Sequence, residues 1–199
     1  ELDPIKGAKS TLDESFRNLV AVGARPHSLA DCLNFGNPEK PVRLGDFKRV
    51  AEGLGEIARH LEIPFISGNV SFYNETEKGP VKPTPTILAS GIIDDIRDSV
   101  TIDIKEKGSA LYLIGETKEE MGGSEYYDMI DGQSRSVPNV DKKRLEDSVE
   151  EMLDAHSMDV IKSCHDISMG GISVALSEMC LAGDIGAEVE VFAGSVKDK

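Results

Sequence analysis

The stretch DCLNFGNPEKP, residues 31–41, decides how the first part of this chain is read. Apolar side chains run into it at Leu29, Leu33 and Phe35, and the turn-forming residues Gly36-Asn37-Pro38 follow directly. This order predicts a strand that opens into a loop at its C-terminal end. Loops at strand ends are frequent places for ligands, because a rigid scaffold positions them. The stretch therefore predicts a polar site carried by a strand.

Helical patterns stand on both sides of this strand. Before it, apolar residues recur every three or four positions from Ile5 onward, which predicts a helix that begins after Asp3 and Pro4 and ends before Gly23. After it, the same spacing predicts a second helix over about 46–61, which Pro64 prevents from continuing. The alternation of strand and helix indicates a mixed fold.

The rest of the chain predicts two α+β units. A short strand at 65–66 delivers Ser67-Gly68-Asn69-Val70-Ser71, a proline-stiffened loop follows, and 86–93 reads as a buried strand. Beyond a charged stretch at 94–107, with a weak strand at 100–104, the predicted elements are strands at 110–114, 160–164 and 187–191 and helices at 140–155 and from Ile172. We place a domain boundary in this charged stretch, which leaves two units of about 100 residues each, as typical domain sizes allow.

Composition excludes several classes of protein. The chain has 199 residues and a formal net charge of −14, so it would repel a nucleic-acid backbone. Its apolar runs are far shorter than the roughly 20 residues of a membrane span, and it has no signal segment, so we expect a cytoplasmic protein. Three widely spaced cysteines indicate buried, reduced thiols. The absence of an initiator methionine before Glu1 predicts a piece of a longer protein.

Two polar constellations are candidate sites. Asp31 with Asn34 and Asn37 offers one carboxylate and two amides, which can hold nucleotide hydroxyls, phosphates or a hard cation. The run 68–71 offers a glycine for close backbone approach, the Asn69 amide oxygen and the Ser71 hydroxyl, which suit phosphate and Mg²⁺. For both, an ordinary turn whose side chains bond their own backbone is the alternative. No Walker A and no GxGxxG sequence is present.

A third constellation lies before the last predicted helix. Gly170-Gly171 at a helix start could receive an anion. The alternative is that Ser168 caps the helix while the glycines allow close packing. His165 and Asp166 precede them, and His165 is more simply a structural hydrogen bonder because no activating partner can be identified in the sequence.

Several strings together resemble one family. RNLVAVGARP (17–26), DCLNFGNPEKP (31–41) and SGNVSFYNET (67–76), followed in order by LIGET (113–117), GGSEY (122–126) and SCHDIS (163–168), are similar to the second half of PurL-type phosphoribosylformylglycinamidine synthases. The resemblance spans nearly the whole chain. It implies an α+β fold of the PurM or aminoimidazole ribonucleotide synthetase type. Residues 1–98 would be the later part of an N-terminal ATP-binding-type domain, and residues 105–199 the first part of a C-terminal domain.

The resemblance also implies roles for residues. The family's ATP contacts fall on Asp31 and Gly68, its Mg²⁺ ligand on Asn69, and its contact to formylglycinamide ribonucleotide on Ser71. The family's catalytic histidine lies in a motif that this sequence lacks, so no catalytic residue is assigned. One departure is Met169, where the family usually has Asp before Gly-Gly, which removes a possible carboxylate there. The residues at 26–30 are also less apolar than usual.

The implied chemistry is an ATP-dependent ligation that forms a C–N bond. ATP would phosphorylate the substrate's amide oxygen, with Mg²⁺ offsetting phosphate charge, and ammonia would displace that phosphate to leave an amidine. The implied partners are the glutaminase PurQ, the small protein PurS and the missing first half of the same protein. We expect the isolated fragment to be inactive. The alternative is a structural half that holds a nucleotide without turnover. Aminoimidazole ribonucleotide synthetase and thiamine monophosphate kinase would share the fold, but DCLNFGNPEKP argues against both.

Overall fold

The computed structural model describes residues 2–132 and 134–190, and its first part is a small sheet with two helices. The elements of this part are α1 (Pro4–Ala21), β1 (Arg25–Asn34), α2 (Pro41–His60), β2 (Phe65–Ser71), β3 (Glu75–Thr76), β4 (Gly79–Pro80) and β5 (Thr84–Ile92). The later elements are a 3-10 turn at Ile96–Asp98, α3 (Glu125–Met129), α4 (Lys142–Ser157) and α5 (Gly171–Gly183). The α+β class predicted from the sequence is confirmed.

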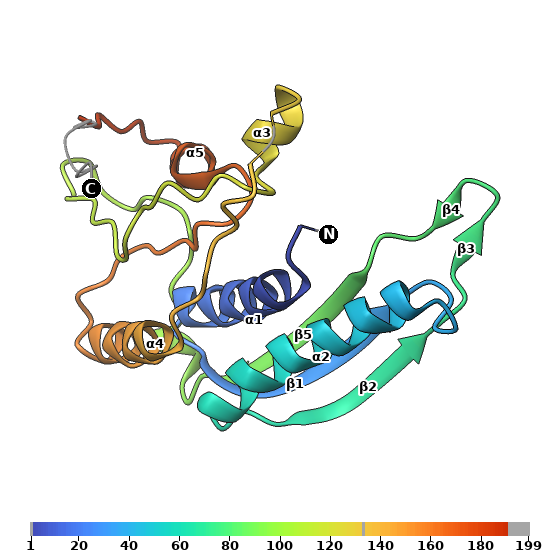
Figure 1. The fold of residues 1–199 in the computed structure, drawn as a ribbon. Helices are drawn as coiled ribbons and strands as arrows, with labels where there is room; N and C mark the ends of the chain where they lie inside the picture. Colours follow the sequence, from blue (N-terminus) through green and yellow to red (C-terminus); the bar gives the residue numbers. More distant parts are fainter. Residues whose placement is uncertain (1, 133, 191–199) are drawn as a thin grey trace.

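The main sheet has the order β2-β1-β5, and Figure 1 shows α1 and α2 on one of its faces. β1 runs parallel to β2 and antiparallel to β5. On the other face of the sheet, Leu88 and Ile92 of β5 remain 68% and 52% exposed. The strand predicted at 86–93 therefore exists, but it is buried on one face only. A separate hairpin, β3-β4, extends beyond the strand ends of the sheet.

Both long helices begin where local chemistry favours a start. The Asp3 carboxylate accepts hydrogen bonds from the backbone N–H groups of Ile5 and Lys6, and Pro4 occupies the first turn of α1, where its missing N–H costs nothing. This confirms the predicted start. Pro41 plays the same part in α2, so that helix begins earlier than the predicted position 46. Gly23, with φ +85°, lets the chain turn after α1 into β1.

The hydrophobic core lies between the sheet and its helices and includes part of α4. Its largest fully buried side chains are Phe16, Phe35, Leu12, Leu29 and Ile57. Leu145 and Val149 of α4 belong to the same cluster. The Asp141 carboxylate caps α4 by accepting from the backbone N–H groups of Lys143 and Arg144, as its predicted start at Asp141 requires. Because α4 packs into this core, it attaches the second part of the chain to the first through apolar contacts.

The second part contains fewer strands than the sequence predicts. Within the described residues of 93–190, the segments 100–104, 110–114, 160–164 and 187–190 form no strand, and residue 191 of the last one lies outside the described residues. Leu111, Tyr112, Leu113 and Ile114 are exposed. An apolar run becomes a strand only when a neighbour pairs with its backbone along a ladder, and these runs make at most isolated backbone hydrogen bonds, such as the one from the N–H of Cys164 to the carbonyl of Thr101. The predicted apolar face of α5 is covered in part: Ala175 is buried, Leu176 and Met179 are half-buried, and Ile172 is exposed.

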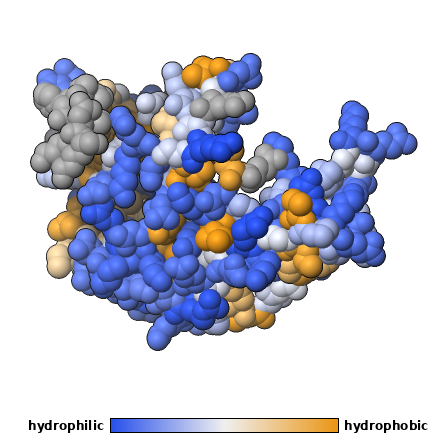
Figure 2. Space-filling model, in the orientation of Figure 1, coloured by the Kyte–Doolittle hydropathy of each residue, from blue (hydrophilic) through white to orange (hydrophobic). Residues whose placement is uncertain are grey.

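The surface is dominated by polar side chains. Hydrophilic residues cover most of the face in Figure 2, with apolar side chains in small separate groups. Across the described residues, no helix combines the length and the apolar character that a membrane crossing requires. Cys32, Cys164 and Cys180 are free thiols, but each is half-buried and not buried as the sequence predicted.

Candidate functional site

The parallel pairing of β1 with β2 brings all four predicted site residues onto two neighbouring strands. In this register Asp31 lies opposite Gly68, Cys32 opposite Asn69, and Asn34 opposite Ser71. The strand was predicted to end at residue 66, before the run 68–71, and this is wrong, because β2 continues through Ser71. The ordinary turn that was the alternative for this run is therefore not formed. Backbone pairing with β1 holds these polar residues extended although they lack an alternating apolar pattern.

Strand alternation divides the four residues between the two faces of the sheet. Asp31 lies between the buried Leu29 and Leu33 and so shares the face that α1 and α2 cover. Gly68 is its neighbour on that face. Asn69 and Ser71, each displaced by an odd number of residues from Gly68, lie on the open face. The structure therefore places Asp31 and Gly68 on the covered face, and Asn69 and Ser71 on the open face.

Gly68 controls access to the Asp31 carboxylate. A Cβ at position 68 would stand 2.7 Å from Oδ1 of Asp31, closer than real Cβ contacts allow. The missing side chain therefore keeps that carboxylate uncovered on the side of β2. Because β2 is an edge strand of the described sheet, a ligand lying along its edge could contact the backbone at Gly68 and reach Asp31 beyond it.

On the open face, Asn69 and Asn34 flank a thiol. The amide nitrogen of each lies 3.7 Å from Sγ of Cys32, and Asn69 is exposed. Contact through the nitrogen leaves the Asn69 amide oxygen free to meet a hard cation.

Two residues that were not predicted as site residues, Asn74 and Glu75, connect the loop after β1 with the hairpin after β2. Glu75 Oε1 accepts from the backbone N–H of Asn37 at 3.1 Å, and its carboxylate pairs with Lys40 Nζ at 2.8 Å. These hydrogen bonds, that of Lys40 first and then that of Asn37, hold the pKa of the Glu75 carboxyl below its usual value. The signal in the sequence was the Asn-Glu pair near the end of SGNVSFYNET, which was interpreted as part of the proline-stiffened loop.

Gly36 allows this close approach of the loops. A Cβ at position 36 would stand 2.9 Å from Cβ of Pro80 in β4. Beneath the loops, Phe47 makes edge-to-face contacts with Phe35 and Phe72, at centroid distances of 5.2 and 5.1 Å. The loop that ends β1 and the hairpin that follows β2 thus form one packed unit at the strand ends.

The third constellation is a hydrogen-bonded cluster. His165 Nδ1 lies 3.1 Å from Oδ1 of Asp166, and its Nε2 lies 2.9 Å from Oε2 of Glu178. Both ring nitrogens of His165 thus contact carboxylates, partners that the sequence alone did not identify. The predicted cap by Ser168 is wrong: Gly170, with φ +82°, is the N-cap residue of α5, and the Ser168 carbonyl accepts from the N–H of Gly171.

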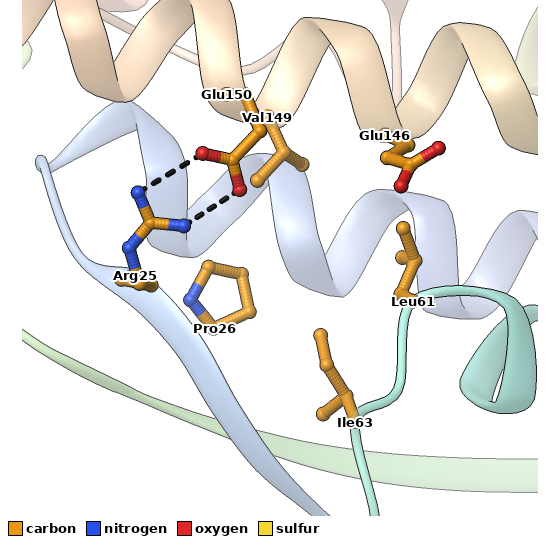
Figure 3. A pocket seen from close by; sticks show the side chains of 7 residues that line it. All are labelled: Arg25, Pro26, Leu61, Ile63, Glu146, Val149 and Glu150. Atoms are coloured by element: carbon orange, nitrogen blue, oxygen red, sulfur yellow. Dashed lines mark hydrogen bonds and ion pairs between the residues drawn. The ribbon is translucent and has the colours of Figure 1, made fainter.

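Two cavities lie away from the strand ends. One, of about 100 Å³, is drawn in Figure 3 between the start of β1, the end of α2 and α4, and there Arg25 pairs with Glu150 through two hydrogen bonds of 2.6 and 3.0 Å. Its volume is too small for a nucleotide. The other, of about 520 Å³, is an open and charged hollow at the start of α4 beside Glu116 and Arg144. Neither is lined by a predicted site residue.

Comparison with known proteins gives matches in both parts of the chain. Residues 1–93 match the family model of AIR synthase related protein, N-terminal domain, and residues 106–197 match that of its C-terminal domain. Phosphoribosylformylglycinamidine synthase subunit PurL of Alkaliphilus metalliredigens is 43% identical over 194 residues, which cover 96% of this chain and 26% of that protein. The PurL subunit of Parvibaculum lavamentivorans is 47% identical, with 94% and 26% covered. The chain thus spans about a quarter of the length of these relatives.

Solved structures share the fold. Thermotoga maritima PurL complexed with FGAR superposes with a TM-score of 0.70 at 18% identity, covering 92% of this chain and 29% of that one. The same protein complexed with ATP gives a TM-score of 0.66 at 18% identity, with 91% and 27% covered.

Proposed function

The chain belongs to the AIR synthase related family, and from this membership we propose that it forms part of a phosphoribosylformylglycinamidine synthase. The observation that carries the proposal is the match to PurL subunits at 40–47% identity through both parts of the chain. The proposed reaction is the ATP-dependent conversion of formylglycinamide ribonucleotide to formylglycinamidine ribonucleotide in purine biosynthesis. We further propose that residues 1–98 and 105–199 are parts of its two domains in the second half, and that the protein is cytoplasmic.

We propose that the nucleotide lies along the edge of β2. There the backbone of Gly68 and the carboxylate of Asp31 would meet it from the helix-covered side, while Asn69 would reach its metal from the open side. An edge strand permits this arrangement because a ligand beside it has access to both faces of the sheet. This supports the proposal that Asp31, Gly68 and Asn69 belong to one site.

The donor set suits Mg²⁺ held mainly by its nucleotide. Amide and carboxylate oxygens are ligands that this hard cation accepts, and Mg²⁺ commonly takes only one or two protein ligands beside phosphates and water. Within the described residues, no group of three or more His, Cys, Asp or Glu side chains could hold a metal ion. The bound ion would offset phosphate charge during phosphoryl transfer. Asn69 would hold it in place.

The residues of the chain then bind and orient the reactants. Asp31 and Gly68 place the nucleotide, Ser71 at the end of β2 contacts formylglycinamide ribonucleotide, and no residue is assigned a proton transfer. Ammonia would come from the glutaminase PurQ, with PurS as bridge. A nucleotide-holding structural half is the second candidate, and one observation favours it: Asp31 is the single ionisable side chain among the four proposed site residues.

We also propose that the first half of the same protein covers the open face of the sheet. Leu88 and Ile92 are exposed there, and the relatives are about four times as long as this chain, so further chain exists to cover an apolar face. In the isolated chain a second copy would take that place. Sedimentation across micromolar concentrations would then show association, whereas a strictly monomeric species would contradict this part of the proposal.

Calorimetric titration of the chain tests the proposed function. We expect ATP to bind more tightly with Mg²⁺ than without it, and formylglycinamide ribonucleotide to bind as well. An ADP-release assay with ammonium as the nitrogen donor should show no substrate-dependent turnover by the chain alone. Binding of neither ligand would contradict the proposal. Nucleotide binding without substrate binding would favour the structural half.

A further inference from the structure

The side chain of Asn74 is held in one orientation. One terminal atom of its amide lies 3.1 Å from the carbonyl oxygen of Phe35 and 3.0 Å from that of Ser71. Carbonyl oxygens only accept hydrogen bonds, so the atom facing both must be the amide nitrogen. The two hydrogens of that nitrogen are thereby directed at two backbone carbonyls, and Oδ1 is left as an acceptor.

This orientation determines how the Ser71 hydroxyl can point. Ser71 Oγ lies 3.2 Å from Oδ1 and 3.0 Å from Nδ2 of Asn74. A hydroxyl has a single hydrogen to donate. Nδ2 donates toward Ser71 Oγ as well as toward the carbonyls, and Oδ1 can only accept, so the hydroxyl hydrogen goes to Oδ1. Ser71 then offers a ligand a lone pair and no hydrogen.

The backbone around Asn74 is fixed by several further contacts. Tyr73 adopts φ +59°, a left-handed conformation that is unfavourable for a non-glycine residue. The N–H of Tyr73 donates to the Gly36 carbonyl at 3.2 Å, and the N–H of Asn74 donates to that of Phe35 at 3.2 Å. The next residue, Glu75, anchors the hairpin to Lys40. These bonds hold the turn that returns Asn74 to Ser71.

We propose that Asn74 is a positioning residue that makes Ser71 a hydrogen-bond acceptor, so that Ser71 recognises an N–H or O–H group of the substrate and not a phosphate oxygen. The proposal rests on the proposed function, which makes Ser71 a substrate contact. Formylglycinamide ribonucleotide carries donors in its amide N–H groups and its ribose hydroxyls, whereas phosphate oxygens of substrate and nucleotide are acceptors. Asn74 thus orients Ser71 toward the amide or ribose portion.

The orientation is tested first without any ligand. Hydrogen exchange of side-chain amides in the ¹⁵N-labelled chain should be at least about tenfold slower for Asn74 than for Asn37, since both hydrogens of Asn74 are hydrogen-bonded. In Asn37 it is the amide oxygen that carries the bond, accepting from the N–H of Glu39 at 2.8 Å. Equal exchange rates for the two side chains would overturn the proposal whether or not substrate binds.

Recognition is tested by a binding cycle on the same chain. Asn74→Ala should weaken substrate binding by about tenfold, the loss expected for one hydrogen bond, and should have no further effect in a Ser71→Ala background. Thr86→Val, which removes an exposed hydroxyl from β5 on the same face, is the matched control and should leave affinity unchanged. An equal loss from Asn74→Ala in both backgrounds would mean that Asn74 supports the fold alone, and would overturn the proposal.

Substrate analogues identify the donor. One analogue carries methylated amide nitrogens and another lacks a ribose hydroxyl. The affinity of each should be measured for the wild type and for Ser71→Ala. The analogue that lacks the recognised donor should bind about tenfold more weakly to the wild type and without penalty to Ser71→Ala. If no analogue shows this dependence, Ser71 does not accept from the substrate. If the wild type binds no substrate, the proposed function fails, and amide exchange still decides the orientation of Asn74.

Discussion

Asp31 and Gly68 are parallel neighbours whose spacing depends on the absence of a side chain at position 68. The nearest carboxylate oxygen would stand 2.7 Å from a Cβ there. The register of β1 with β2 thus places a carboxylate beside a strip of bare backbone at the edge of the sheet. That geometry suits a ligand needing both close backbone approach and a polar side chain, and it is the basis of the proposed nucleotide site.

Gly68→Ala should therefore strain the sheet. We expect the free energy of unfolding to fall by about 1–3 kcal/mol, the usual cost of overpacking, and ATP affinity to fall with it. Urea unfolding measures the first effect. Gly7→Ala is the control, because nothing lies within 4 Å of a Cβ at that helical position, and it should stabilise by about 0.5–1 kcal/mol. A Gly68→Ala chain as stable as the wild type would show that the Asp31 carboxylate moves aside freely.

The attachment of α4 to the first part should depend on apolar packing more than on its surface ion pairs. Leu145 is 4% exposed within the shared core, so Leu145→Ala should cost about 2–5 kcal/mol. Glu150→Gln breaks the ion pair with Arg25 seen in Figure 3, and because both side chains are more than half exposed it should cost at most about 1 kcal/mol. Thermal or urea unfolding compares them, and a larger loss from Glu150→Gln would reverse this ranking.

The hydrogen bonds of Glu75 with Lys40 and with the N–H of Asn37, together the Glu75 anchor, should stabilise the fold less at low pH. Its pKa lies below the usual 4.5 in the folded protein because Lys40 and the Asn37 N–H bind the carboxylate. Its contribution to stability is thus complete above the unfolded pKa and is lost as the pH falls through the lowered folded value. The difference in unfolding free energy between wild type and Glu75→Gln should be constant above about pH 5 and shrink below it. A difference that does not vary with pH would contradict the anchor.

Lys40→Met provides the companion test of the same anchor. Lys40 is the first cause of the lowered pKa of Glu75. When Glu75 is present, removing Lys40 should therefore reduce how much the free energy of unfolding falls at low pH. In the Glu75→Gln background the same change should have little effect, since the two side chains act as one pair.

The sequence predicted best those elements whose signals are local. Asp3 and Asp141 cap α1 and α4 as expected, because capping chemistry acts within one turn. The extension of β2 through Ser71 escaped prediction because the run is polar and only pairing with β1 holds it extended. Conversely, the apolar run 110–114 reads as a strand and forms none, since strands need a partner.

The sequence did not predict how the four proposed site residues are arranged. Asp31, Gly68, Asn69 and Ser71 do lie on adjacent strands, but their division between two faces follows from the register, which a sequence does not reveal. Asn74 and Glu75 were missed because their partners, Phe35 and Lys40, are distant in the chain and the hairpin reads as turn residues alone.

The most direct test of the account is calorimetric titration of ATP, with and without Mg²⁺, into the wild-type chain and Asn69→Leu. The substitution keeps a similar volume and deletes the amide oxygen proposed to hold the metal. Mg²⁺-dependent ATP affinity should fall by about 1.5–3 kcal/mol, the range for contacts that involve charge, while stability changes little because Asn69 is exposed. Unchanged Mg²⁺-dependent affinity, together with a lower melting temperature, would show instead that Asn69 serves the fold and would contradict the proposed site.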